Sequence, residues 1–250
     1  MSEYAIGVDE AGRGPVIGPL VVCALSIPID DYATLREMGV KDSKLLSKMR
    51  RAKIFEQIKG AVKERNWGLG IVVCEPSMID YNSIESNLNM LEVELFTEAI
   101  RATQSQNKKG TIFLDACDVN SKRFGRNVES LLSHDWSNWR IESEHGMDAS
   151  DELTGASSIV AKAIRDSAII ELSREIGLDL GSGYPSDPVT KAAVADLISG
   201  EVPHDCLRWT WATVGNAWKS THGTPVPIRT QRGVISSQSD LRLWMDGNHK

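Results

Sequence analysis

The sequence is poor in cysteine and in basic charge and has no long apolar run, and each shortage excludes a class of protein. Its four cysteines lie far apart, without a Cys-x-x-Cys pair, so neither a zinc site nor a disulfide framework is indicated. No stretch approaches the roughly 18 consecutive apolar residues of a membrane span, and the first residues lack the pattern of a signal peptide. We expect a cytoplasmic, monomeric protein that does not bind a membrane.

The charge balance is acidic, with a formal net charge of −6. A domain that only binds nucleic acid is expected to be basic, so this balance argues against that class. The acid excess lies before residue 219, and acids that bind cations would have their charge offset. Composition alone leaves the partner open.

The apolar pattern predicts an α/β fold, because three early strands are followed by helices that alternate with two short strands. The expected strands are Tyr4–Asp9, Ile17–Ile27, Trp67–Cys74, Thr111–Leu114 and Trp139–Ser143. The expected helices are Lys48–Arg65, Leu88–Ala102, Lys122–Ser133, a long one over Leu153–Ile176, and Lys191–Ile198. We predict a catalytic domain over residues 1–218, with a helical C-terminal part, and a flexible tail over 219–250, where Gly, Pro, Ser and Gln dominate.

The most informative motif is the run Val8–Pro15, where two adjacent carboxylates precede a Gly-Arg-Gly turn at the end of a strand. Carboxylates suit hard divalent cations, and a glycine-freed backbone beside an arginine suits a phosphate. Adjacent strand residues point to opposite faces, so Asp9 and Glu10 converge only if the backbone breaks at once, as Ala11-Gly12 permits. The motif predicts phosphoryl-transfer chemistry.

Four acids at strand ends or helix starts form a candidate site for two metal ions: Asp9, Glu10, Asp115 and Asp148. The alternative for each acid is a solvated or helix-capping role. The fourth position is open among Asp148, Asp151 and Glu152. Ser150 is a plausible helix N-cap, which would explain Asp151 and Glu152 as first-turn acids, so we choose Asp148.

Five motifs together resemble the ribonuclease HII family, in particular its archaeal branch, over roughly residues 4–218. They are VDEAGRGPVIGP, KDSK, FLDACDV, ASSIVAKAIRD and GSGYPSDP. The resemblance implies a ribonuclease H-like fold, with a five-stranded mixed sheet flanked by helices and a helical C-terminal extension. It implies that the four acids bind divalent ions. We expect two ions, Mg²⁺ or Mn²⁺, with Asp9 as the ligand that bridges them.

The resemblance also implies the substrate: RNA–DNA hybrids and DNA duplexes that contain ribonucleotides, in replication and ribonucleotide excision repair. The cut would fall 5′ of a ribonucleotide and leave 3′-hydroxyl and 5′-phosphate ends. Gly12, Arg13 and Gly14 resemble the family's loop that touches the ribonucleotide 2′-hydroxyl and the adjacent phosphate. Tyr184 resembles the tyrosine that stacks on the next deoxyribose. If the resemblance is set aside, the alternative interpretations are a tight turn for Gly12–Gly14 and a loop-packing role for Tyr184.

Two short groups of polar residues are candidates for contacts to backbone phosphates. Lys41, Ser43 and Lys44 share a loop, whereas Lys162 and Arg165 lie three residues apart on one helix face. Each of these charges, taken alone, is also explained as a solvated surface residue.

The tail carries a short motif that looks like the sliding-clamp (PCNA) binding peptide. Gln238 is followed by Leu241 and Trp244 at spacings of three, with Met245 in place of a second aromatic. A disordered segment with a few anchoring side chains can bind in this way. An incidental apolar patch is the alternative.

Two other functions remain to be weighed against a ribonuclease. A binding module with the same fold but no activity would have no use for four clustered acids. A nuclease that acts on DNA alone would not need a Gly-Arg-Gly loop and Tyr184, which both serve the recognition of a 2′-hydroxyl.

Overall fold

A single mixed sheet forms the centre of the molecule in the computed structural model, which describes residues 3–40, 46–85, 87–229 and 235–238. Its strand order is β5-β4-β1-β2-β3-β6. The pairs β1–β4 and β4–β5 are parallel, and the other neighbours are antiparallel. The strands are β1 (Tyr4–Ala11), β2 (Leu20–Pro28), β3 (Gly68–Cys74), β4 (Gly110–Asp115), β5 (Trp139–Glu144) and β6 (Ile235–Gln238).

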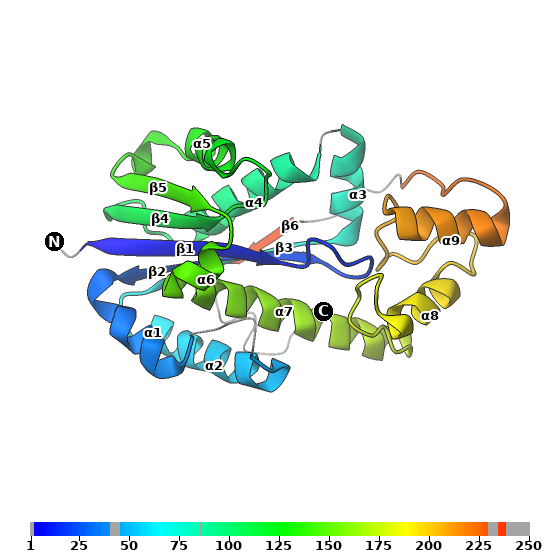
Figure 1. Ribbon diagram of the computed structural model, residues 1–250, viewed down its shortest axis with the longest axis horizontal. Helices are drawn as coiled ribbons and strands as arrows, with labels where there is room; N and C mark the ends of the chain where they lie inside the picture. Colours follow the sequence, from blue (N-terminus) through cyan, green and yellow to red (C-terminus); the bar gives the residue numbers. More distant parts are fainter. Residues whose placement is uncertain (1–2, 41–45, 86, 230–234, 239–250) are drawn as a thin grey trace.

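Helices cover both faces of the sheet (Figure 1). One face carries α1 (Tyr32–Met38), α2 (Lys48–Glu64) and α7 (Glu152–Ile176). The other carries α3 (Pro76–Glu85), α4 (Leu88–Ala102) and α5 (Ser121–Leu131). The short elements are η1 (Ile29–Asp31), η3 (His134–Trp136) and α6 (Met147–Ser150).

The two cores follow from the period-two alternation of the central strands. In β1, Ala5 and Ala11 pack toward α7, whereas Tyr4, Ile6 and Val8 pack toward α4. Because both faces of β1 are covered, the strand is apolar nearly throughout, and its two acids stand out at its C-terminal end. The five predicted strands and the mixed sheet are confirmed.

The C-terminal helices α8 (Pro188–Leu197) and α9 (Ala212–His222) form a third layer with its own apolar cluster, at the end of the sheet where β1 ends (Figure 1). The predicted limit after residue 218 falls inside α9, because this helix continues until Gly223 takes a left-handed conformation. The predicted tail also supplies β6, which pairs with the edge strand β3 as a sixth strand.

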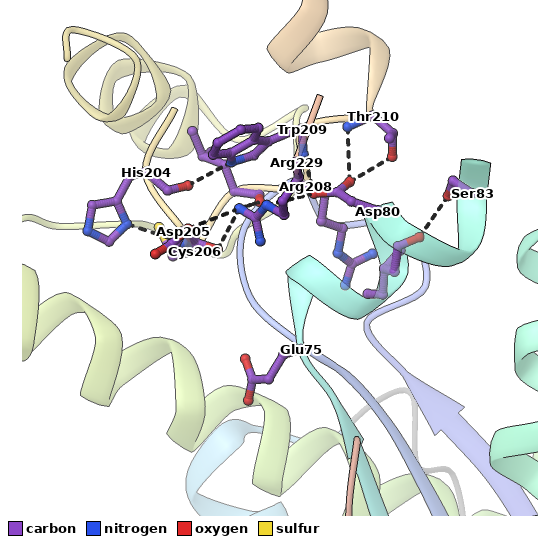
Figure 2. A network of polar contacts seen from close by, with 12 residues as sticks. Glu75, Asp80, Ser83, His204, Asp205, Cys206, Arg208, Trp209, Thr210 and Arg229 are labelled. Carbon is purple, nitrogen blue, oxygen red and sulfur yellow. Dashed lines mark hydrogen bonds and ion pairs between the residues drawn. The ribbon is translucent and has the colours of Figure 1, made fainter. Parts of the chain in front are cut away.

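A polar network fastens this C-terminal part to helix α3 (Figure 2). The buried carboxylate of Asp80 accepts hydrogen bonds from the backbone N–H groups of Trp209 and Thr210, at 2.9 and 3.0 Å. Arg229 lies over the Trp209 ring, 4.4 Å from its centroid, and its Nε is 3.5 Å from an Asp80 oxygen. The segment around residue 208 is thereby held against helix α3.

Among the described residues, no helix combines the length and the apolar character needed to cross a membrane.

Candidate active site

One cleft brings together every predicted site residue that the structure describes. It has a volume of about 270 Å³ and lies at the C-terminal end of β1. Its lining includes Asp9, Glu10, Gly12, Arg13, Gly14, Asp115, Asp148, Lys162, Arg165 and Tyr184. The other three predicted residues, Lys41, Ser43 and Lys44, lie outside the described part of the chain.

Three carboxylates meet in this cleft from three separate segments. Asp9 and Asp115 lie side by side on neighbouring strands. β1 and β4 are parallel, and Val8 is paired with Leu114, the residue before each acid. Asp148 comes from α6, just after β5. One carboxylate oxygen from each of the three acids lies within 4.8 Å of the others, a spacing suited to a divalent cation.

The loop before Asp148 is built around Asp115. Gly146 takes a left-handed conformation, φ 69°, and begins α6. The N–H groups of Gly146 and Met147 both donate to Asp115 Oδ1, at 2.8 and 3.3 Å. These bonds fix the turn that carries Asp148 toward Asp9.

The structure also separates Asp148 from the two neighbouring acids. Asp151, not Ser150, is the N-cap of α7: its Oδ1 accepts the Thr154 N–H at 2.7 Å. The prediction for Ser150 is wrong because this serine ends α6 and its hydroxyl donates back to the Met147 carbonyl. Asp151 is therefore occupied by the cap, and Asp148 alone of the candidates joins the cluster.

Glu10 lines the cleft but stands apart from the three-acid cluster. The expected break in the backbone comes too late to turn it, because β1 continues regularly through Ala11. Alternate residues of a strand point to the same face, so the Glu10 side chain lies on the same face as Val8, toward α4. The Asp9 side chain lies on the opposite face, toward α7. The pair still converges in part: after burial, the charge of Glu10 and a hydrogen bond with its side chain raise the pKa of Asp9.

Burial and the repulsion of neighbouring charges raise the pKa of Asp9 and of Asp115. Burial, then the charge of Glu10 and of Asp115, raises the pKa of Asp9 well above its usual range. Burial, then Asp148, also raises the pKa of Asp115, although its two backbone N–H donors oppose the shift. A bound cation would relieve this repulsion, so the oxygen donors present fit a divalent metal.

The glycine-rich loop beside the acids is held from behind by Arg208. This fully buried side chain donates to the carbonyls of Gly12, Arg13 and Gly18, at 2.5 to 3.2 Å. Gly12 has φ +94°, and a Cβ there would lie 2.5 Å from the Pro19 carbonyl oxygen, so only glycine fits. No local pattern in the sequence indicates this role for Arg208, since its partners lie about 190 residues away in the chain.

Arg13 has two partners that sequence reasoning missed, both on helix α4. Its Nε donates to Glu92 Oε1 at 2.7 Å, and its Nη2 donates to Asn89 Oδ1 at 2.8 Å. The alternative explanation of residues 12–14, a tight turn with a solvated arginine, does not describe Arg13. A signal existed, because Glu92 interrupts the apolar stripe that runs through Leu91 and Leu95.

The opposite side of the cleft is formed by α7 and the loop at Tyr184. Lys162 Nζ lies 2.5 Å from Ser158 Oγ and 3.9 Å from Asp148 Oδ2. The buried guanidinium of Arg165 donates to the Ser182 carbonyl and lies 5.0 Å from the centroid of the Tyr184 ring. Arg165 therefore supports Tyr184, whose side chain is exposed and also neighbours Gly14.

Comparison with known proteins identifies the family. The family model for ribonuclease HII matches residues 6–214. Ribonuclease HII of Methanocella arvoryzae is 41% identical over 210 residues, which cover 83% of this chain and 88% of that protein.

Two solved structures are similar in fold and sequence. Ribonuclease H2 from Pyrococcus horikoshii OT3 is 34% identical, with a TM-score of 0.74 and coverage of 88% of this chain and 100% of the other. The ribonuclease HII in a PCNA:RNase HII complex from Archaeoglobus fulgidus is 34% identical, with a TM-score of 0.73 and coverage of 85% and 96%.

The mixed sheet with clustered acids at its C-terminal edge places the chain in the class of divalent-metal-dependent ribonuclease H enzymes. Within that class it belongs to the ribonuclease HII family. The protein is accordingly a hydrolase with ribonuclease H endonuclease activity.

Proposed function

We propose that this enzyme cuts on the 5′ side of a ribonucleotide at RNA–DNA junctions, including a single ribonucleotide embedded in duplex DNA. The products carry 3′-hydroxyl and 5′-phosphate ends. One observation carries the proposal: the three close carboxylates share a cleft with the Gly12–Gly14 loop and Tyr184. Metal ligands and groups suited to sensing one sugar hydroxyl are thus adjacent.

Asp9, Glu10, Asp115 and Asp148 are the proposed ligands of two divalent ions, Mg²⁺ or Mn²⁺. Their donors are all oxygen, as these hard cations prefer. When bound, the ions supply activation of a water and stabilisation of the charge that develops on the leaving 3′ oxygen. Asp9, the most buried of the four, is the proposed bridging ligand.

The glycine-rich loop is the proposed sensor of the 2′-hydroxyl. In a trans peptide the carbonyl and the following N–H point in opposite directions. Because the carbonyls of Gly12 and Arg13 accept from Arg208, the N–H groups of Arg13 and Gly14 point away from it. Two amide donors are then available to a sugar hydroxyl or a phosphate, while the Tyr184 ring stacks on the next deoxyribose and leaves no room for a hydroxyl there.

The test compares a duplex with one embedded ribonucleotide with the same duplex made only of DNA, under Mg²⁺ and under Mn²⁺. We expect a single cut 5′ of the ribonucleotide and none in the all-DNA control. Asp9→Asn should abolish cleavage and largely preserve duplex binding, whereas the exposed Asp135→Asn should leave both unchanged. Turnover by Asp9→Asn would exclude the two-metal mechanism.

We further propose that the tail binds a sliding clamp through Gln238, Leu241 and Trp244. The support is the peptide pattern and the relative from Archaeoglobus fulgidus, whose structure is described as a complex with PCNA. Gln238 ends β6, and the other two residues lie outside the described part of the chain. Deletion of residues 238–250 should abolish clamp binding in a pull-down and leave cleavage of free duplex intact.

A further inference from the structure

Glu92 is a buried acid that the proposed metal site does not use. It lies on α4, and its side chain is fully buried. Oε1 accepts the Arg13 Nε–H at 2.7 Å, whereas the buried Oε2 has no hydrogen-bond partner among the described residues. An unsatisfied, buried carboxylate oxygen costs stability, so packing alone does not explain an acid at this position.

The arrangement around Arg13 is a rigid fork. Asn89 and Glu92 lie three residues apart on α4 and therefore share a face of the helix. They hold Nη2 and Nε of Arg13, so two bonds fix the plane of the guanidinium. The third nitrogen, Nη1, takes part in neither of these two bonds. The Arg13 side chain is 41% exposed and lines the cleft.

We propose that Glu92 is a positioning residue, which together with Asn89 orients Arg13 so that its Nη1 binds a phosphate of the substrate strand beside the ribonucleotide. This inference rests on the proposed function of the cleft. When Glu92 is ionised, the Arg13–Glu92 pair is neutral as a whole, so the phosphate is bound by a directed N–H donor rather than by net charge. An ionised acceptor holds the Nε–H more tightly than an amide would, which explains the acid.

A structural role and a positioning role make different predictions for Glu92→Gln. Glu92→Gln removes the buried charge and keeps an oxygen that accepts the Arg13 Nε–H. Arg13 is 41% exposed, so the guanidinium that stays charged remains in contact with water and is not a buried, uncompensated charge. A positioning residue therefore loses activity on substitution without losing stability. Its effect must also depend on the presence of Arg13.

The experiment is a double-mutant cycle with wild type, Glu92→Gln, Arg13→Ala and the double variant. Glu94→Gln, on an exposed position of the same helix, is the matched control. The substrate is a duplex with one embedded ribonucleotide, and kcat, KM, the melting temperature and the Kd for the duplex without divalent ions are measured. The two single variants should each lower kcat/KM about tenfold through KM, because a phosphate contact acts on ground and transition states alike.

The double variant should be no worse than Arg13→Ala, Glu94→Gln should equal wild type, and Glu92→Gln should melt no lower than wild type. The inference is overturned if Glu92→Gln keeps wild-type kcat/KM, if its loss persists in the Arg13→Ala background, or if a higher Mg²⁺ concentration restores it. If the wild type does not cut the duplex, the proposed function fails. The Kd for the duplex then tests the role of Glu92 separately. Glu92→Gln and Arg13→Ala must each weaken duplex binding to the same extent, and the double variant must bind no more weakly than either.

Discussion

At the scale of single residues, the cleft holds several acidic side chains close together, although their negative charges repel one another. Asp9 is buried beside other acids, and its pKa is raised chiefly by burial and then by Glu10 and Asp115. Such an arrangement is unfavourable for the metal-free protein and favourable once a cation is present. Stability should therefore report on metal binding.

We expect Mg²⁺ or Mn²⁺ to raise the melting temperature at pH 8, because a ligand that binds only the folded state adds about 2.7 kcal/mol at 100 times its Kd. Asp9→Asn should lose most of this rise. Without metal, the same variant should melt above wild type, since one repelling charge is gone. Differential scanning calorimetry with and without EDTA measures both effects, and Asp135→Asn should behave as wild type.

Glu92 gives a pH dependence of its own. Burial, only partly offset by Arg13, raises its pKa from 4.5 to about 7. The folded state then binds the proton more tightly than the unfolded chain. The stability from this group is full below about pH 4.5 and is lost as the pH rises through about 7.

Glu92→Gln removes that titration. The variant should equal wild type in stability near pH 4.5 and exceed it by about 1–3 kcal/mol at pH 8, given about 1.4 kcal/mol for each pKa unit. Urea denaturation at a series of pH values tests this. A difference that does not change with pH would contradict the assignment.

At the scale of elements, the contact between β1 and α7 sets the distance between the acids. A Cβ at Gly7 would lie 2.4 Å from the backbone nitrogen of Thr154, so helix and strand touch backbone to backbone. The Ser157 hydroxyl donates to the Gly7 carbonyl at 2.8 Å and fixes the same contact. Asp9 follows Gly7 by two residues, and α6, with Asp148, leads directly into α7.

Gly7→Ala should therefore push α7 away from the sheet. We expect a loss of about 2–3 kcal/mol in the free energy of unfolding, as is usual for overpacking, and a fall of at least about tenfold in kcat. Gly60→Ala, where no atom lies within 4 Å of the added methyl group, should instead stabilise α2 by about 0.5–1 kcal/mol without changing kcat. Equal effects of the two changes would refute the argument from close contact.

At the scale of the whole molecule, the C-terminal layer supports the cleft from outside the sheet. Asp80 on α3 holds the backbone at Trp209 and Thr210 (Figure 2), and the adjacent Arg208 reaches the carbonyls of the glycine-rich loop. Arg208 is fully buried, and this burial lowers its pKa to about 10. The C-terminal layer and the loop it supports therefore form one unit.

Arg208→Lys should break that unit, because one ammonium group cannot serve three carbonyls in the geometry of a guanidinium. We expect a loss of about 3 kcal/mol in stability and at least a tenfold fall in kcat/KM for the ribonucleotide duplex. The exposed Arg174→Lys on α7 is the control. Chemical denaturation and steady-state kinetics below the melting transition measure the two effects.

The main elements could be predicted from the sequence because their signals are local. The apolar stripe of Leu88–Ala102 matches α4 at both ends, and the strand ending at Asp115 lies where the apolar run stops. The cap of α7 was misplaced by one residue, because serine and aspartate are equally good N-caps. The strand β6 could not be foreseen, since its partner β3 lies over 160 residues away in the chain.

The sequence by itself determined the family, the mixed sheet and the acids at its edge, because motif order and hydrophobic period need no knowledge of distant contacts. The sequence already favoured Asp148 as the fourth acid, but only the tertiary structure brought it beside Asp9 and Asp115 while Asp151 caps α7, and only the structure placed Glu10 on the opposite face of β1. It also assigned Arg13 to Glu92 and Asn89, 79 and 76 residues away. These choices depend on parallel strand register and on the packing of α4 and α7, which bring together groups whose separation in the chain carries no local signal.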